Sequence, residues 1–206
     1  MKTLLLSFSL LSAQALACLQ SPADGLHYRI SQHGQSQDIY LWVEEDRKVR
    51  YRPDQQQVEV WQRQNSRLEL DKHFLDSGKT LSYYQGDLRT LGLPLDWPSQ
   101  GSPVSPALLE GLAGESHEDV HCQKASRYQK GQAELIWLSD WQLPASLSQG
   151  DYRLELVGQA GLDLKALERR WRGFEQIDFA DIGDMEGDPV IGKLIKQGFV
   201  EHGDHH

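Results

Sequence analysis

The sequence predicts a mainly β (α+β) domain, built as a curved antiparallel sheet of about seven to ten strands with a few covering helices. Two observations favour this class. Segments that alternate apolar and polar residues recur over residues 25–84, with turn-forming residues between them. A second alternating region covers residues 134–157. Alternation predicts antiparallel strands with one face in water, and short turns predict that consecutive strands are neighbours.

Strands are expected wherever this alternation is combined with aromatic or β-branched residues. The first region contains the segments 27–30, 39–43, 49–52, 58–61, 68–70 and 80–84. The second region contains the segments 134–138, 143–147 and 152–157, and a further strand is expected at 174–179. Trp42, Trp61 and Trp137 fall inside these segments, so they are expected in the core rather than on a carbohydrate-binding surface.

The segment between the two regions has a different composition. Residues 92–106 are rich in Pro, Gly and Ser, which predicts a loop. Ser105 before Pro106 predicts the start of a short helix over residues 106–112. The stretch that follows, 114–132, is polar, and no strand is assigned to it.

Helices are expected near the C-terminus. Residues 162–172 resemble a helix, and Gly173 separates it from the strand that follows. Asp188-Pro189 predicts a second helix start, with Asp188 as the cap and Pro189 in the first turn. The apolar residues then fall on one face until Gly198, which favours a cap over a metal ligand at Asp188.

Residues 1–17 have the layout of a bacterial secretory signal peptide. Lys2 precedes a short apolar stretch, and Ala15-Leu16-Ala17 forms a small-x-small cleavage signal. No segment has the run of about 18 apolar residues that a transmembrane helix needs. We therefore expect a signal peptide at 1–17, one β-rich domain at 18–198 and a flexible His-rich tail at 199–206, in an exported, periplasmic protein.

The two cysteines, Cys18 and Cys122, leave three interpretations open. An even pair in an exported protein predicts a disulfide first, and a loop of about 100 residues would contribute roughly 4–5 kcal/mol. Alternatively, Cys18 follows the cleavage point and could carry a lipid anchor, which would make the protein an outer-membrane-anchored lipoprotein. Against this, Ala15 stands where lipoprotein signals usually have leucine. Free thiols are the third interpretation.

Charge and composition exclude some partners. The formal net charge of the 206-residue chain is −9, with no clustered basic stripe in the sequence. Phosphate contacts need clustered Lys and Arg, so nucleic acid is not an expected partner. An acidic chain is also poorly suited to an anionic membrane surface.

Histidines form the only metal-binding pattern that we identify in the sequence. His202, His205 and His206 lie in the last five residues, and imidazole suits Cu(II), Zn(II) and Ni(II). His117 and His121 would add an i, i+4 pair if their segment were helical. No HExxH spacing or other catalytic signature occurs, so no catalytic residue or further cofactor is expected.

The run DIYLWVEEDRKVRYRPDQQQVEVWQRQNSRLELDKHF, with the later ELIWLSDWQLPASL and DYRLELVG, resembles the outer-membrane lipoprotein-sorting and carrier proteins. The resemblance covers roughly residues 37–157. It implies a curved antiparallel sheet that is covered by helices and holds an acyl chain on its concave side. The chain also resembles proteobacterial periplasmic proteins that end in a FADIGD-type acidic segment.

These observations lead to two functional hypotheses. The first is a non-enzymatic periplasmic binding or accessory protein for a lipidic or other apolar small molecule, or for a protein partner. The alternative is a periplasmic protein that binds Cu, Zn or Ni through its His-rich C-terminus.

Overall fold

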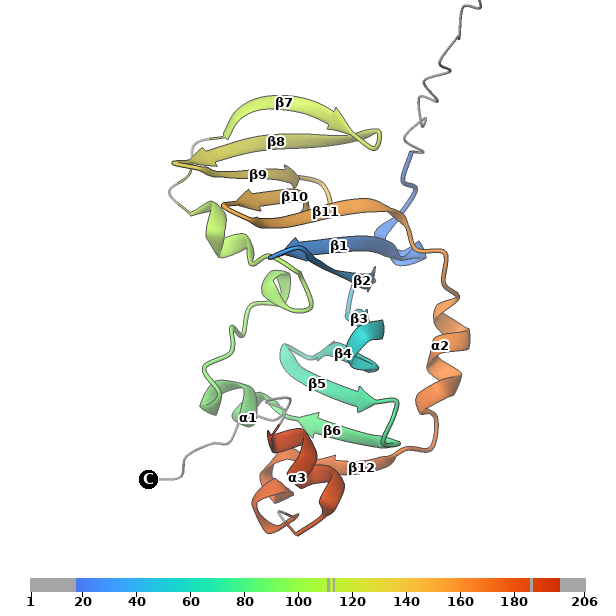
Figure 1. The fold of residues 1–206 in the computed structure, drawn as a ribbon. Coiled ribbons are helices and arrows are strands. Elements are labelled where there is room, and N and C mark those ends of the chain that lie inside the picture. Colours follow the sequence, from blue (N-terminus) through green and yellow to red (C-terminus); the bar gives the residue numbers. More distant parts are fainter. Residues whose placement is uncertain (1–17, 111, 113, 186, 197–206) are drawn as a thin grey trace, which may run out of the picture.

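The computed structural model describes residues 18–196, except 111, 113 and 186, and places twelve strands in one open sheet (Figure 1). The strand order is β12-β6-β5-β4-β3-β2-β1-β11-β10-β9-β8-β7. Every pairing is antiparallel except that of β12 with β6. The predicted mainly β, antiparallel class is therefore confirmed.

The helices and strands have the following bounds. The strands are β1 Leu26–Gln32, β2 Gln35–Val43, β3 Arg47–Arg52, β4 Gln57–Gln64, β5 Arg67–Phe74, β6 Lys79–Tyr83, β7 Gly114–Val120, β8 Gln123–Lys130, β9 Ala133–Leu138, β10 Leu143–Gln149, β11 Tyr152–Gln159 and β12 Glu175–Asp178. The α-helices are α1 Gln85–Thr90, α2 Leu164–Trp171 and α3 Pro189–Lys196. Short 3-10 helices are η1 Pro22–Asp24, η2 Pro53–Gln55, η3 Trp97–Ser99, η4 Pro106–Leu109 and η5 Phe179–Met185.

The expected number of strands was wrong. All ten predicted segments are strands, but the polar stretch in which no strand is expected forms two more, β7 and β8. Their backbones pair with each other and with β9, so the sheet ladder rather than an apolar face fixes these strands. The predicted helix at 106–112 is shorter than expected and is the 3-10 helix η4.

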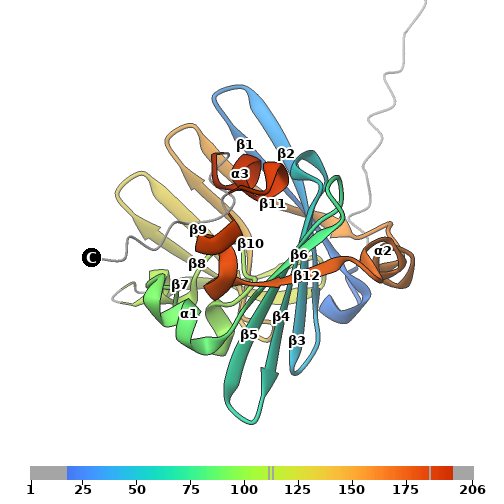
Figure 2. The ribbon, with the colours of Figure 1, turned by 90° about the horizontal axis from the view of Figure 1, so that it is seen from below.

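The chain forms the sheet from two meanders, each made of consecutive strands. Strands β1 to β6 run from the middle of the sheet towards one edge, and the connection after β6 carries the chain along the stack to β7 at the other edge. Strands β7 to β11 then return, and β11 pairs with β1. Helix α2 runs along the opposite side of the stack and leads to β12 (Figure 1). The strand directions rotate from one edge to the other, as the twist of a β-sheet requires (Figure 2).

Two helices identify the two faces of the sheet. On one face, here called the α2 face, Val49 and Val60 pack with Leu167 of α2. On the other, the α3 face, Leu70 and Phe74 of β5 pack in one cluster with Ile191 of α3. A third cluster gathers around β1, β2 and β8 to β11 and contains all of the fully buried leucines of those strands.

Strands β4 and β6 are buried on both faces, which contradicts the expectation of one wet face. Residues 57–61 of β4 and all five residues of β6 are buried. The long connections that cross the sheet supply the second cover. Trp42, Trp61 and Trp137 are buried, as predicted.

Helices α2 and α3 begin at the expected positions. Asp163 accepts a hydrogen bond from the amide of Lys165 at the start of α2. The Oδ1 atom of Asp188 accepts hydrogen bonds from the amides of Val190 and Ile191, at 2.7 and 3.3 Å. These bonds satisfy amides that have no partner within the helix.

Candidate functional site

The structure joins Cys18 and Cys122 in a disulfide, as the first of the three interpretations predicted. The bridge links the first described residue to the turn between β7 and β8, across 104 positions of the sequence. Both cysteines are exposed.

The predicted metal ligands do not come together in the part of the chain that the structure describes. His202, His205 and His206 lie outside the described residues. His117 lies in strand β7 and His121 in the turn after it, so the helical i, i+4 arrangement is wrong. Instead, His121 is buried and its Nε2 lies 3.0 Å from the carbonyl oxygen of Leu156. Between residues 18 and 196, apart from the three gaps, no group of three His, Cys, Asp or Glu side chains could hold a metal ion.

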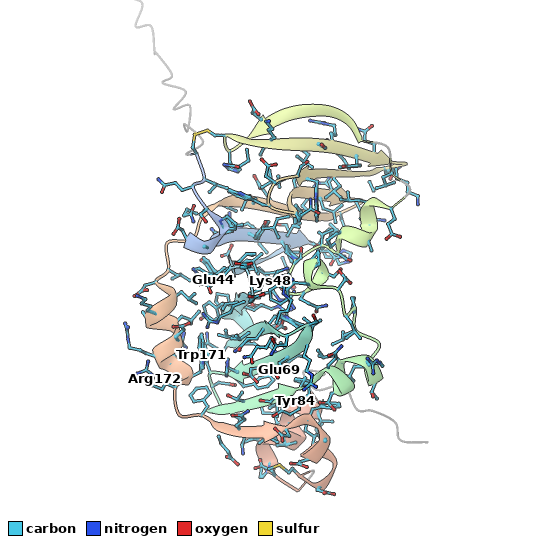
Figure 3. The ribbon with its side chains drawn as sticks, turned by 180° about the vertical axis from the view of Figure 1, so that it is seen from behind. Glu44, Lys48, Glu69, Tyr84, Trp171 and Arg172 are labelled. Carbon is cyan, nitrogen blue, oxygen red and sulfur yellow. A yellow bond between two sulfur atoms is a disulfide. The ribbon has the colours of Figure 1, made fainter. Side chains whose placement is uncertain are left out.

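A row of cations on strand β3 is the most unusual feature of the described structure. Val49 points to the α2 face, and side chains alternate along a strand, so Lys48, Arg50 and Arg52 all point to the α3 face. These three residues are here called the cationic row. Lys48 lies in the middle of the stack of strands, far from both sheet edges (Figure 3).

The pairing of β3 with its neighbours defines what surrounds this row. Lys48 lies opposite Trp61 of β4, and Arg50 lies opposite Glu59. On the other side, Val43 of β2 lies opposite Lys48. Since paired residues share a face, the row runs between apolar residues of two hydrophobic clusters.

Glu59 is the carboxylate at the centre of the row. Arg50 donates to it from Nε, at 3.0 Å, and from Nη2. Arg52 lies 3.4 Å from its second oxygen. Burial raises the pKa of the Glu59 carboxyl, but the charges of Arg50, Arg52 and Lys72 outweigh burial, so this pKa lies below its ordinary value. Glu59 is therefore an ionised carboxylate at neutral pH.

The two arginines remain within reach of solvent, whereas Glu59 does not. The side chain of Glu59 is 6% exposed, compared with 17% for Arg50 and 25% for Arg52. The further hydrogen bonds of Arg52 go to the neutral side-chain amides of Gln55 and Gln57. Each guanidinium carries five N–H donors, so donors on both remain for an additional acceptor.

Lys48 ends the row in a different environment. It is 5% exposed, and its Nζ donates to the carbonyl oxygens of Trp97 and Pro98, at 2.8 and 3.2 Å. The ammonium also lies 4.9 Å from the centre of the Trp97 ring. Burial lowers the pKa of Lys48 to about 8, and the nearby charge of Asp96 opposes this shift. Gly101 lies close to Lys48. A Cβ atom at position 101 would be 3.3 Å from the Cβ of Lys48.

The α2 face carries a second polar group, with a structural role. Ser82 donates to the Oδ1 of Asp71 at 2.6 Å, and Gln176 donates to the Ser82 hydroxyl. The Nδ1 of His73 lies 2.7 Å from the Thr80 hydroxyl. His73, Thr80 and Ser82 are all buried, and the ring of Trp171 stacks on His73, so these hydrogen bonds hold neighbouring strands together inside the protein.

The sequence contains a signal for the cationic row that the alternation pattern alone does not reveal. The segment Arg47–Arg52 alternates charged residues with Val49 and Tyr51, which predicts an apolar face and a wet face. Lys48, Arg50 and Arg52 nevertheless form a short basic stripe, which corrects the expectation that the sequence contains none. Burial of that second face depends on distant residues, chiefly the connection that contains Trp97.

No protein-family model matches the chain, and no curated protein matches it in sequence. Two solved structures share some of its arrangement. The structure of PNGF-II in a C2 space group is 11% identical, with a TM-score of 0.45, over 80% of this chain and 32% of that chain. An uncharacterised conserved protein from Thermus thermophilus is 12% identical, with a TM-score of 0.32, over 76% of this chain and 91% of that chain. The chain thus spans about a third of the length of PNGF-II, and neither similarity assigns it a family or an activity.

Proposed function

We propose that the protein is an exported, non-enzymatic binding protein that holds an amphipathic acid against the cationic row. The ligand would be a molecule with a carboxylate or phosphate group attached to an apolar part. The observation that carries this proposal is that Arg50 and Arg52 share a single buried carboxylate, Glu59.

The charge balance around Glu59 favours an anion from outside the protein. Among the described residues, Glu59 is the one acidic side chain within ion-pair distance of Arg50 or Arg52. Two guanidinium groups and one carboxylate leave an excess positive charge in a partly buried place, and the charge of Asp54, which also acts on Arg52, offsets it only in part because Asp54 is exposed to water. Such a charge costs free energy unless it is compensated, and the planar guanidinium matches the oxygens of carboxylate and phosphate groups.

The apolar neighbours of the row favour an amphipathic ligand over a small inorganic anion. Val43 lies opposite Lys48 on the same face and is half-buried, whereas Leu41, opposite Arg50, is fully buried in the core beneath. A ligand whose acidic group meets the arginines would bring its apolar part against Val43. The hydrophobic contact and the charged contact would then both contribute to binding.

Export is supported by the disulfide and by the predicted signal peptide. Disulfides persist in oxidising compartments, such as the bacterial periplasm, and are rare in the cytosol. No described helix is both long enough and apolar enough to cross a membrane.

Binding of three matched ten-carbon probes tests this proposal. We expect the wild-type protein to bind decanoate and decyl phosphate, and to bind the uncharged decanol much more weakly, as measured by isothermal titration calorimetry. A preference between the two acids would distinguish a carboxylate ligand from a phosphate ligand. Binding of the alcohol as tightly as the acids would show that the row takes no part.

Two variants and one control locate the site. Arg50→Gln and Arg52→Gln each remove one guanidinium, and we expect the affinity for both acids to fall by about tenfold or more, as for the loss of a charged hydrogen bond. Arg153→Gln is the control, because Arg153 is exposed and bonds only to the carbonyls of Gly150 and Tyr152. Circular dichroism of each variant checks that it is folded. Equal affinities in all four proteins would refute the proposed site.

A further inference from the structure

The Cys18–Cys122 disulfide joins the tip of an edge hairpin to the N-terminal segment, which leads into the central strand β1. Strands β7 and β8 form this hairpin, and residues 120–123 are its tip. In the sheet order, β8, β9 and β10 separate β7 from β11. Even so, His121 at the tip reaches the carbonyl oxygen of Leu156 in β11. The hairpin tip therefore folds back over the strands that separate it from the centre.

Among the described residues, three hydrogen bonds join the tip to other segments, and the N-terminal segment supplies two of them. The amide of Leu19 donates to the carbonyl oxygen of His121 at 3.2 Å. The side-chain amide of Gln123 donates to the carbonyl oxygen of Leu19 at 3.1 Å. Leu19 itself is buried in the cluster that contains Leu156. The disulfide ties this segment to the tip. Its removal leaves these two hydrogen bonds, the one from His121 and the packing of Val120 against the same cluster.

Strand β7 gives the hairpin little further support. It is an edge strand, and within the described sheet it pairs with β8 alone. The Nδ1 atom of His121 is also buried with no hydrogen-bond partner among the described residues. A buried polar atom without a partner costs free energy, and release of the tip would expose it to water. Both features favour opening of the hairpin once the disulfide is reduced.

We propose that this disulfide is a redox-sensitive link that holds the hairpin in place. A dithiol reductant releases the tip of the β7–β8 hairpin while β3 to β5 stay folded. Both cysteines are exposed, so a reductant can reach the sulfur atoms. One thiolate of the dithiol attacks a sulfur of the bridge, which forms a mixed disulfide and releases one protein thiol. The second thiol of the reductant then attacks the mixed disulfide and releases the other protein thiol. The S–S bond of the protein is reduced to two thiols, and the dithiol is oxidised to a disulfide.

Hydrogen exchange followed by mass spectrometry tests this proposal on the oxidised protein with and without dithiothreitol. We expect amide exchange in residues 114–130 to become at least tenfold faster on reduction, with no change in residues 47–74. The double variant Cys18→Ser/Cys122→Ser should exchange like the reduced protein in both solutions, which excludes a direct effect of the reagent.

Two results would overturn the proposal. Unchanged exchange in residues 114–130 after complete reduction would mean that the disulfide does not hold the hairpin. Faster exchange in residues 47–74 as well would mean that the bridge supports the whole sheet, as an ordinary structural disulfide does.

Discussion

Arg50 and Glu59 face each other across β3 and β4 and form an ion pair on the face of the sheet that the sequence predicts to be wet. The pair lies inside the protein because the connections that cross the sheet cover both of its faces. Arg52 shares the same carboxylate. We expect the stability of the fold to depend on Glu59, and under our proposal the two arginines bind a second anion.

Glu59→Gln should destabilise the protein strongly. The variant leaves Arg50 and Arg52 without a negative partner, and breaking a buried ion pair costs roughly 3–5 kcal/mol. We expect about 3 kcal/mol, because both arginines keep some contact with water. Urea unfolding measures the change. Glu155→Gln, at an exposed position of β11, is the control and should change the free energy of unfolding by less than about 0.5 kcal/mol. Similar decreases in the free energy of unfolding of the two variants would show that the buried ion pair contributes no more to stability than an exposed carboxylate does.

His73 should make the protein sensitive to acid. Burial first, and then the charge of Arg47, lower the pKa of His73 from 6.5 to about 4. Between these pH values the unfolded chain binds a proton that the folded protein does not. The free energy of unfolding therefore falls as the pH drops from 6.5 towards 4, by about 3 kcal/mol in all from this residue.

The variant His73→Gln isolates this contribution. Glutamine does not titrate and keeps an amide that can bond to Thr80, the partner of His73. Unfolding free energies measured at several pH values should decrease less steeply in the variant than in the wild type. Parallel curves for the two proteins would mean that His73 titrates at its ordinary pKa in the folded state.

Gly25 is required by its surroundings as well as by its backbone. It has φ +89, and a Cβ there would lie 2.4 Å from the Nε1 of Trp42. Gly34 also has a positive φ, +75, but no atom lies within 4 Å of the place that a Cβ would take. We expect Gly34→Ala to cost about 1 kcal/mol from backbone strain alone. Gly25→Ala should cost about 1–3 kcal/mol more, because Trp42 must move. Thermal unfolding of both variants gives the comparison, and equal losses would argue against the steric clash.

Asp188 combines a helix cap with an ion pair. Its Oδ1 accepts from the first amides of α3, while its Oδ2 lies 3.0 Å from the Nζ of Lys79. Asp188→Asn keeps an oxygen for the cap and loses the charge, whereas Asp188→Ala loses both. The melting temperature should therefore decrease from wild type to the Asn variant and again to the Ala variant. A lower melting temperature for Asn than for Ala would contradict the capping role.

The sequence predicted those parts of the fold that local patterns determine. Local strand patterns located ten strands, the segment before Gly173 located α2, and the capping residue Asp188 located α3, because these signals depend on neighbours in the chain. Strands β7 and β8 were not predicted, because residues 114–130 are polar and the pairing with each other and with β9 fixes these strands. Helix α1 also escaped, since six residues give too little periodicity to recognise.

The candidate site could not be derived from local pattern. A strand such as β3, with Val49 and Tyr51 on one side and cations on the other, looks the same whether its polar face meets water or protein. That face is buried because Trp97 and Pro98, about fifty residues later, pack over Lys48. Only the three-dimensional arrangement shows that Arg50 and Arg52 converge on one carboxylate.

A crystal structure of the protein with decyl phosphate tests the central claim most directly, since the phosphate gives a strong feature in the electron density. We expect the phosphate oxygens to lie within hydrogen-bonding distance of both Arg50 and Arg52. A phosphate bound away from the cationic row, or no bound ligand from a saturating solution, would contradict it.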